Sequence, residues 1–246
     1  MKIYNKLLMS PFVYPEAVIF DTDNTLYPYI PAHEQATFAV EDKVQRTLGI
    51  NKPEFREAYS LARTEIKERL GNVASSHSRL LYLQVTIEKL GLGTQILLTL
   101  DLEQTYWRTF LVNCRLFPDA LNFIHVLKAR GIATANITDL TAQIQFRKLV
   151  YFGLDELFDF VVTSEEAGQD KPDSKPFSVA FEKLKIKPKN IWMIGDNPWN
   201  DMVGAHHSGM VKVQKVHSGV VVGSTTESCP DISFEHYGEL IKLFSD

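Results

Sequence analysis

The chain has 246 residues, of which 26 are Lys or Arg and 30 are Asp or Glu, so its formal net charge is −4. A mildly acidic chain does not attract nucleic acid or an anionic membrane electrostatically, so we expect neither as a partner. Hydrophobic residues make up 45% of the sequence, which is ordinary for a soluble globular protein and sufficient for a sizeable core. No run is long enough to span a membrane, and residues 1–16 lack the apolar segment and cleavage site of a signal peptide.

The two cysteines, Cys114 and Cys229, lie far apart and form no CxxC pattern. This usage fits a reducing compartment better than a disulfide framework, so we expect a cytoplasmic protein. The length predicts one large domain, or a core with a smaller second domain. A monomer and a homodimer are both compatible with the sequence.

The first clear element follows a short extension over residues 1–16. Ala17–Phe20 is a continuous apolar run, which is typical of a strand buried on both faces of a parallel sheet. From residue 28 to residue 115 only helix-period segments follow, and they predict an inserted helical bundle. The expected helices run from Pro31 to Gly49, from an N-cap at Asn51 to Gly71, from Ser78 to Leu90, and from an N-cap at Thr94 to Asn113.

From Pro118 onward, strand and helix patterns alternate. The expected strands are Ile132–Ile137, Phe158–Val162, Ile191–Gly195, Val211–Val216 and a short one near Ile232. The expected helices run from a first turn containing Pro118 to Gly131, then over 142–153, 176–184, 200–208 and 237–244. This alternation predicts a parallel sheet covered on both faces. We therefore expect an α/β fold with a Rossmann-like core from residues 1–27 and 116–246, and an all-α domain over 28–115.

Polar side chains follow the carboxyl ends of four predicted strands, where ligands bind in open α/β sheets. They are Asp21, Asp23, Thr138, Asp139, Lys171, Asp196 and Asp201. Neighbouring carboxylates repel unless a cation relieves them, and Mg²⁺ prefers oxygen ligands. A lysine, a hydroxyl and several carboxylates suit phosphoryl transfer. Each residue has an ordinary alternative as a turn residue, a helix cap or a solvated lysine, but their joint placement after buried strands favours a site.

The order and spacing of these residues resemble the motifs of the haloacid dehalogenase superfamily. DTDNT at 21–25 matches the first motif DxDx(T/V), and Thr138 after a strand matches the second. Lys171 in KPD matches the third motif, and GDNPWND followed by GAHHSGM matches the fourth. The match extends from about residue 17 to about residue 210. The resemblance implies that the helical insertion is the superfamily's cap, placed between the first and second motifs.

The resemblance also implies roles. Asp21 would be the nucleophile that forms an aspartyl-phosphate, and Asp23 the general acid and then the general base. Mg²⁺ would be held by Asp21, the backbone carbonyl of Asp23 and Asp196, with Asp201 in support, directly or through water. Thr138 and Lys171 would bind the phosphate group.

Asp139 departs from the family pattern, which usually has Asn at this position. A carboxylate facing the phosphate would repel it. We therefore expect the Asp139 side chain to cap the following helix, so that only its backbone N–H is offered to the phosphate.

Several further residues are weaker candidates. Arg79 in the helical insertion suits a second anionic group of a substrate, although a solvated helix face is the ordinary alternative. His33, together with Tyr29 and His77, is another insertion residue suited to a substrate. The adjacent His206 and His207 do not share a helix face, so surface or packing roles are expected. Trp199 either forms a wall of the site or packs.

The function implied by the resemblance is Mg²⁺-dependent hydrolysis of a small phosphorylated metabolite. A phosphomutase of the β-phosphoglucomutase kind uses the same intermediate, and the sequence does not separate the two. A 2-haloacid dehalogenase needs neither a protonated leaving group nor a metal, so Asp23, Asp196 and Asp201 disfavour it. A receiver module would place its lysine last and carry no insertion, and a non-catalytic scaffold is disfavoured because every catalytic position is filled.

Overall fold

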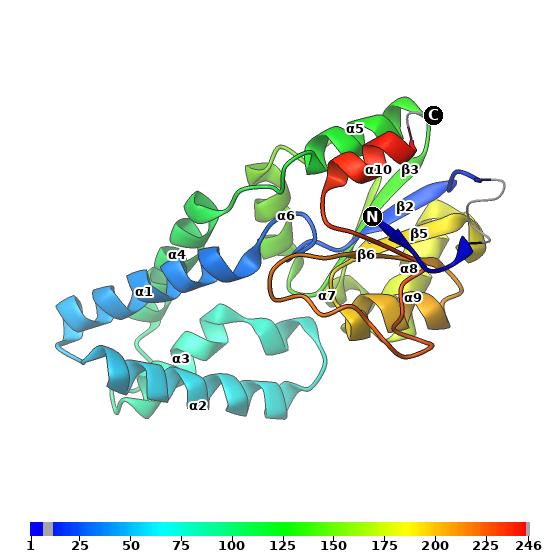
Figure 1. Ribbon diagram of the computed structural model, residues 1–246. Helices are drawn as coiled ribbons and strands as arrows, with labels where there is room; N and C mark the ends of the chain where they lie inside the picture. The colour runs from blue at the N-terminus through cyan, green and yellow to red at the C-terminus, as the bar shows by residue number, and fades with distance from the viewer. Residues whose placement is uncertain (7–11, 245–246) are drawn as a thin grey trace. The chain divides into compact units, whose positions relative to one another are not determined.

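The computed structural model describes residues 1–6 and 12–244, which form two compact units. Met1–Pro28 and Arg115–Asp246 make the first, called the core unit below. Tyr29–Cys114 makes the second, called the helical unit. The core unit is α/β with a mainly parallel sheet, and the helical unit is all-α (Figure 1). The expected fold class, a Rossmann-like core with an inserted helical domain, is confirmed.

The sheet of the core unit has seven strands in the order β1-β7-β6-β5-β2-β3-β4. All neighbouring strands are parallel except β1 and β7, which are antiparallel at one edge. The strands are β1 (Lys2–Ile3), β2 (Ala17–Phe20), β3 (Ala133–Thr138), β4 (Phe160–Thr163), β5 (Ile191–Gly195), β6 (Val211–Lys215) and β7 (Ile232–Phe234). The central strand β2 lies between β3 and β5, so the carboxyl ends of these three strands share one edge.

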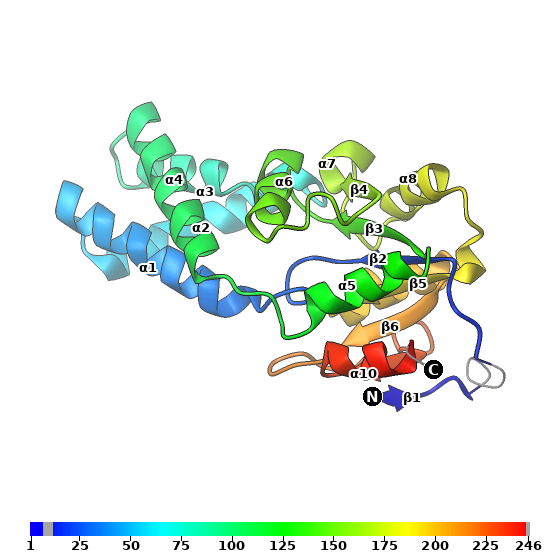
Figure 2. The same cartoon turned by 90° about the horizontal axis from the view of Figure 1, so that it is seen from above.

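Helices cover both faces of this sheet, with α5 and α10 on one side and α8 and α9 on the other (Figures 1 and 2). The α-helices of the core unit are α5 (Ala120–Ala129), α6 (Ala142–Tyr151), α7 (Ser164–Ala167), α8 (Ser174–Leu184), α9 (Gly204–His207) and α10 (Tyr237–Leu243). A 3₁₀ turn at Pro188–Asn190 precedes β5, and a π-helix at Pro198–Val203 precedes α9.

The strand β2 is buried on both faces, as its apolar run predicts, because its side chains alternate between the two helical layers. Ile19 belongs to the cluster that contains Phe177 of α8. Phe20 points to the opposite layer, where its ring centroid lies 6.2 Å from that of Phe123 in α5. Burying side chains of this size stabilises the fold by about 1.5–3 kcal/mol each. This packing holds the residues that follow β2 at a defined position.

The helical unit contains α1 (Tyr29–Leu48), α2 (Lys52–Leu70), α3 (Arg79–Lys89) and α4 (Ile96–Asn113), with a 3₁₀ turn at Ala74–His77. The predicted N-cap Asn51 is confirmed, because its side chain accepts a backbone N–H at 3.0 Å. Ser78, predicted only as the start of a helix, caps α3 by accepting the Leu81 N–H at 3.3 Å. The predicted N-cap Thr94 is wrong. Its hydroxyl donates to the Glu88 carboxylate at 2.5 Å, and Gln95 occupies the cap position of α4.

Three expectations for the core unit change. Pro118 lies outside α5, which begins after Asp119 in a left-handed conformation (φ 63°). The helix expected over 200–208 begins two residues earlier, at Pro198, because the Asn197 side chain caps it by accepting the N–H groups of Trp199 and Asn200. Its first part, Pro198–Val203, is a π-helix. The strand β1 lies within the expected extension. With two residues, it is too short to show the alternation of apolar and polar residues that predicts a strand. Residues 7–11 of that extension lie outside the described residues.

Candidate active site

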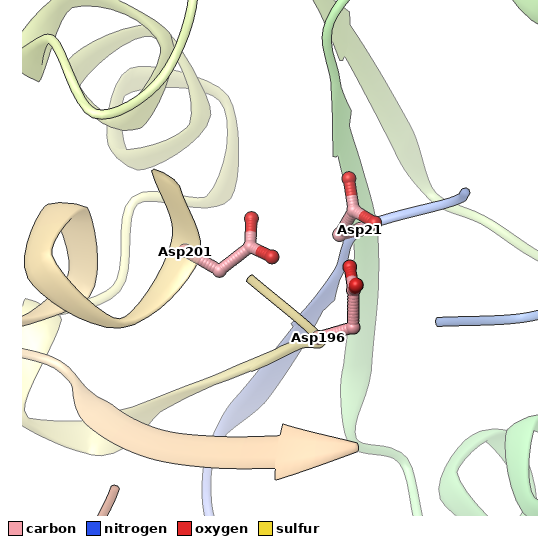
Figure 3. Close-up of side chains that lie close together, drawn as sticks. All are labelled: Asp21, Asp196 and Asp201. Carbon is pink, nitrogen blue, oxygen red and sulfur yellow. The ribbon is translucent and has the colours of Figure 1, made fainter. Parts of the chain in front are cut away.

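The carboxyl ends of β2 and β5 bring three carboxylates together. Phe20 pairs with Ile194 in the parallel ladder, so Asp21 and Asp196, one and two residues further along, follow neighbouring strand ends. Asp201 approaches them from the π-helix, and one oxygen of each residue lies within 4.8 Å of the others. Figure 3 shows the three carboxyl groups gathered at this edge of the sheet.

Lys171 joins two of these carboxylates. Its Nζ donates to Oδ1 of Asp21 at 2.6 Å and to Oδ1 of Asp201 at 2.7 Å. A third contact, at 3.3 Å, reaches the carbonyl of Ile137 in β3. Burial lowers the pKa of Lys171, but the carboxylates of Asp201 and Asp21 outweigh it and raise this pKa well above its usual value. The ammonium group is therefore charged at neutral pH.

The negative charge of the cluster is only partly balanced. Burial, with the neighbouring Asp201 and Asp21, raises the pKa of Asp196 to about 9. Burial also raises the pKa of Asp21 to about 6, although Lys171 opposes this change. Three carboxyl groups therefore share one ammonium group, and the raised pKa of Asp196 reflects a repulsion among them that a divalent cation would relieve.

The donor set fits Mg²⁺. This ion takes oxygen ligands at about 2.1 Å, so opposite ligands lie about 4 Å apart. One oxygen from each of Asp21, Asp196 and Asp201 lies within 4.8 Å of the others, so the three carboxyl groups are close enough together to share one such ion. These three residues are the ones in this cluster that would hold the metal.

Two further contacts orient the carboxylates. The Thr25 hydroxyl donates to Oδ2 of Asp21 at 3.0 Å, and the Asn197 N–H donates to Oδ2 of Asp201 at 3.0 Å. Thr25 belongs to the DTDNT motif, but no contact of its side chain was predicted. With Lys171 on the remaining oxygens, Asp21 and Asp201 are each held at both ends of the carboxylate.

Gly195 at the end of β5 is the backbone position that makes room for Asp201. A Cβ at this position would lie 2.3 Å from Oδ2 of Asp201 and 2.5 Å from its Cβ. Replacing Gly195 by Ala should therefore displace Asp201 and raise the Mg²⁺ concentration needed for half-maximal thermal stabilisation by about 10-fold or more. Thermal unfolding during a Mg²⁺ titration measures this.

The control for Gly195→Ala is Gly238→Ala, because the nearest atom to a Cβ at Gly238 is Oδ2 of Asp119, at 3.3 Å. That variant should respond to Mg²⁺ like the unmodified protein. An unchanged Mg²⁺ response in Gly195→Ala would show that Asp201 does not contribute to metal binding.

Asp23 does not belong to the three-carboxylate cluster, although its spacing from Asp21 allowed both to face one site. Its carboxylate pairs with Lys148 of α6, whose Nζ lies 2.8 Å from Oδ1 and 3.2 Å from Oδ2. The Tyr27 hydroxyl donates to the same Oδ1. The sequence pattern placed Lys148 only within a helix and did not predict this partner.

Thr138 and Asp139 lie at the carboxyl end of β3, on the side of β2 opposite β5. Thr138 is the last residue of β3 and is buried. The expected capping role of Asp139 is wrong, because Thr141 occupies the N-cap of α6. Instead, Oδ1 of Asp139 accepts the backbone N–H of Lys171 at 3.0 Å. Burial raises the pKa of Asp139 to about 6, which Lys171 opposes.

In the helical unit, the expectation of a solvated face for Arg79 is wrong. Its Nη1 donates to the His77 carbonyl at 2.8 Å, and its Nη2 donates to the Tyr29 hydroxyl. The guanidinium carbon lies 5.4 Å from the ring centroid of Tyr106 and 5.5 Å from that of Tyr82. Arg79 is therefore enclosed by aromatic side chains of its own unit.

His33 also contacts this aromatic group. Its Nδ1 lies 2.7 Å from the Tyr106 hydroxyl. Burial and the neighbouring Arg79 lower the pKa of His33 to about 4, so the ring is neutral near pH 7. A neutral imidazole offers a hydrogen bond rather than a charge.

Three other candidates lie at the surface. His206 and His207 are exposed, and Nε2 of His207 lies 3.4 Å from the Glu227 carboxylate. A surface position is one of the two roles expected for them. Trp199 is 62% exposed and does not pack into the core.

Comparison with known proteins agrees with this fold. The family model of haloacid dehalogenase-like hydrolases matches residues 15–209. The chain belongs to this family. This hydrolase is 34% identical to the ribulose-1,5-bisphosphate 5-phosphatase of Halopiger xanaduensis, over 93% of the chain and 99% of that protein.

Two further similarities extend the comparison. The hydrolase is 30% identical to the glyceraldehyde 3-phosphate phosphatase of Methanopyrus kandleri, over 81% of the chain and 83% of that protein. Its fold resembles that of a haloacid dehalogenase-like phosphatase from Thermococcus onnurineus, with a TM-score of 0.70, 26% identity, and coverage of 92% and 96% of the two chains. Family and relatives together identify the chain as a phosphoric monoester hydrolase.

Proposed function

We propose that this hydrolase is a Mg²⁺-dependent phosphatase that releases phosphate from a small phosphorylated metabolite through an aspartyl-phosphate on Asp21. The observation that carries this proposal is the cluster of Asp21, Asp196 and Asp201 around the Lys171 ammonium. A metal and a lysine at one point are what a phosphoryl group needs, because its oxygens carry the charge that must be stabilised.

Asp21 is the residue best placed to attack phosphorus. Thr25 and Lys171 hold its two oxygens, so the carboxylate is oriented before substrate binds. In the first step, a bond forms between an Asp21 oxygen and phosphorus while the bond from phosphorus to the leaving oxygen breaks. Lys171 is close enough to Asp21 to pair with the oxygens of the transferred group. Thr138 and the backbone N–H of Asp139, at the end of the adjacent β3, would hydrogen-bond those oxygens.

Asp23 has a different environment and therefore a different role. Its carboxyl group lies outside the metal-binding cluster, so it need not stay ionised as a metal ligand and can carry the proton that the leaving oxygen receives. It gives a proton to the leaving oxygen in the first step. In the second step it takes a proton from the water that attacks phosphorus, which releases inorganic phosphate and restores the Asp21 carboxylate.

Mg²⁺ fits this site as described above. It would be held by Asp21, the backbone carbonyl of Asp23, Asp196 and Asp201, and when bound it supplies positive charge against the phosphoryl oxygens. The relatives named above act on sugar phosphates, ribulose 1,5-bisphosphate and glyceraldehyde 3-phosphate, which supports a substrate of this size and class.

The test is phosphate release from a panel of phosphorylated metabolites, measured with Mg²⁺, with EDTA, and after Mg²⁺ is restored. We expect release that requires Mg²⁺ and recovers when the metal returns. Formation of an isomeric sugar phosphate without release would identify a phosphomutase instead. No product from any compound of the panel would contradict both.

A further inference from the structure

Lys148 is a buried cation that the proposed reaction does not use. Its side chain is only 1% exposed, and lysine is rarely buried so completely unless it is paired. Its Nζ lies 2.8 Å from Oδ1 and 3.2 Å from Oδ2 of Asp23. The same Nζ lies 5.9 Å from the ring centroid of Tyr27.

The position of Lys148 on α6 makes this pairing unusual. The buried residues of α6 are Ile144, Gln145, Lys148 and Leu149, which form the inward face of the helix. An apolar side chain is the ordinary occupant of such a face. Removing an ammonium group from water costs several kcal/mol, and an ion pair with good geometry offsets that cost. The buried ammonium group of Lys148 therefore needs the Asp23 carboxylate next to it, because their ion pair offsets the cost of burial.

The same face of α6 also contacts the segment after β3. Nε2 of Gln145, one helical turn before Lys148, donates to the carbonyl of Asp139 at 2.9 Å. The same helix face thus contacts Asp23 through Lys148 and Asp139 through Gln145. Lys148 and Gln145 therefore connect α6 to the segments after β2 and β3, both of which contribute to the site.

The two carboxylates of the first motif have separate lysine partners. Lys171 pairs with Asp21, and Lys148 pairs with Asp23. The Tyr27 hydroxyl and the shorter Lys148 contact converge on one oxygen, Oδ1 of Asp23. Donors from two sides restrict rotation of this carboxyl group, so its direction is set before the substrate arrives.

We propose that Lys148 is a positioning residue that holds the Asp23 carboxyl group where it can protonate the leaving-group oxygen. The inference rests on the proposed phosphatase function. A general acid has to lie within hydrogen-bonding distance of the atom that it protonates, and a displacement of about 1 Å can cost about 10²-fold in rate. Lys148 itself exchanges no proton. The proton moves from Asp23 to the leaving oxygen as the bond from phosphorus to that oxygen breaks.

The leaving group provides the test. An alkoxide leaves slowly without a proton, whereas the 4-nitrophenolate of 4-nitrophenyl phosphate leaves readily without one. The value of kcat/KM covers the steps up to departure of the leaving group and excludes hydrolysis of the aspartyl-phosphate. Replacing Lys148 by Met should therefore lower kcat/KM about 10²-fold for the best alkyl phosphate of the panel, but less than about 10-fold for 4-nitrophenyl phosphate.

Matched variants separate positioning from a general structural effect. Lys148→Arg retains the charge and should recover most of the activity toward the alkyl phosphate. Lys183→Met removes another paired lysine of the core unit, whose Nζ lies 2.7 Å from the Glu166 carboxylate, and should affect both substrates little. Tyr27→Phe removes the second donor to Asp23 and should reproduce the selectivity of Lys148→Met more weakly. If Lys148→Met does not fold, Tyr27→Phe and Lys148→Arg decide the question.

Equal losses on the two substrates, or no loss on the alkyl phosphate, would overturn the role of Lys148 while leaving the phosphatase proposal intact. If the unmodified protein releases phosphate from neither compound, the phosphatase proposal fails and the role of Lys148 fails with it. Selective loss on the alkyl phosphate, with recovery in Lys148→Arg, supports the proposal.

Discussion

Replacing Asp21 by Asn is expected to reduce Mg²⁺-dependent phosphate release by about 10⁴-fold or more. The amide keeps the size of the side chain but is not a nucleophile, and loss of a covalent nucleophile costs far more than loss of a single hydrogen bond. The contacts of Asp21 with Thr25 and Lys171 make it the oriented carboxylate of the cluster. Phosphate release measures the effect, and mass spectrometry of the acid-quenched protein should detect phosphorylation of the unmodified chain only.

A matched control for Asp21→Asn is Asp119→Asn. Asp119 is exposed and adopts a left-handed conformation, which Asn also tolerates. This variant should retain full activity. Activity of Asp21→Asn within about 10-fold of the unmodified protein would contradict the nucleophilic role, because general acid–base groups alone contribute about 10²- to 10⁴-fold.

Replacing Lys171 by Met is expected to lower activity strongly and to destabilise the fold at neutral pH. The Lys171 side chain is 2% exposed and forms ion pairs with both Asp21 and Asp201. Breaking a buried ion pair from one side typically lowers the free energy of unfolding by about 3–5 kcal/mol, because it leaves uncompensated charge. Activity should fall by about 10³-fold, since a donor near the transferred phosphoryl group is lost.

The stability deficit of Lys171→Met should depend on pH in a defined direction. Even with Lys171 present, burial raises the pKa of Asp21 to about 6, and removing the ammonium group raises it further. A carboxyl group whose pKa is raised by folding destabilises the protein above that pKa, and this cost disappears below the unfolded value of about 3.9. The free energy of unfolding of Lys171→Met, relative to the unmodified protein, should therefore recover as the pH falls from 7 to 5.

Urea unfolding at pH 7 and pH 5 measures this difference. Lys183→Met is the matched control, because its partner Glu166 is 43% exposed and such surface pairs contribute about 1 kcal/mol or less. A deficit of Lys171→Met that is equal or larger at pH 5 would show that the buried carboxylates are not its cause. Added Mg²⁺ at pH 7 should also reduce the deficit.

Much of the fold could be predicted from local patterns. Ala17–Phe20 is apolar at every position because both faces of β2 are covered, and a strand of this kind needs no distant information to be recognised. Asn51 and Ser78 cap their helices through contacts three residues away, so these helix starts are also local. The placement of Asp21 and Asp196 at one edge follows from the general rule for parallel sheets.

Other parts of the site depend on residues far apart in the sequence. The ion pair between Asp23 and Lys148 spans 125 residues, and the contact between the Asp139 carboxylate and the Lys171 N–H spans 32. The helical period does place Lys148 on the inward face of α6, between Gln145 and Leu149, and this is the signal that could have found it. The local pattern predicted a helix-capping role for Asp139, because a local pattern contains no information about which distant segment packs beside this side chain. That segment is the one that contains Lys171.

The order of hydrophobic and polar residues was enough to establish the α/β core, the helical insertion, and the edge of the sheet where the acidic residues gather. Those features arise from short-range periodicity and from the geometry common to all parallel sheets. The strand order decided that β5 lies beside β2, and the packing of α6 decided that Asp23 pairs with Lys148 outside the cluster formed by Asp21, Asp196 and Asp201. Burial sets the charge on each of these groups, and burial exists only once segments distant in the chain have packed together.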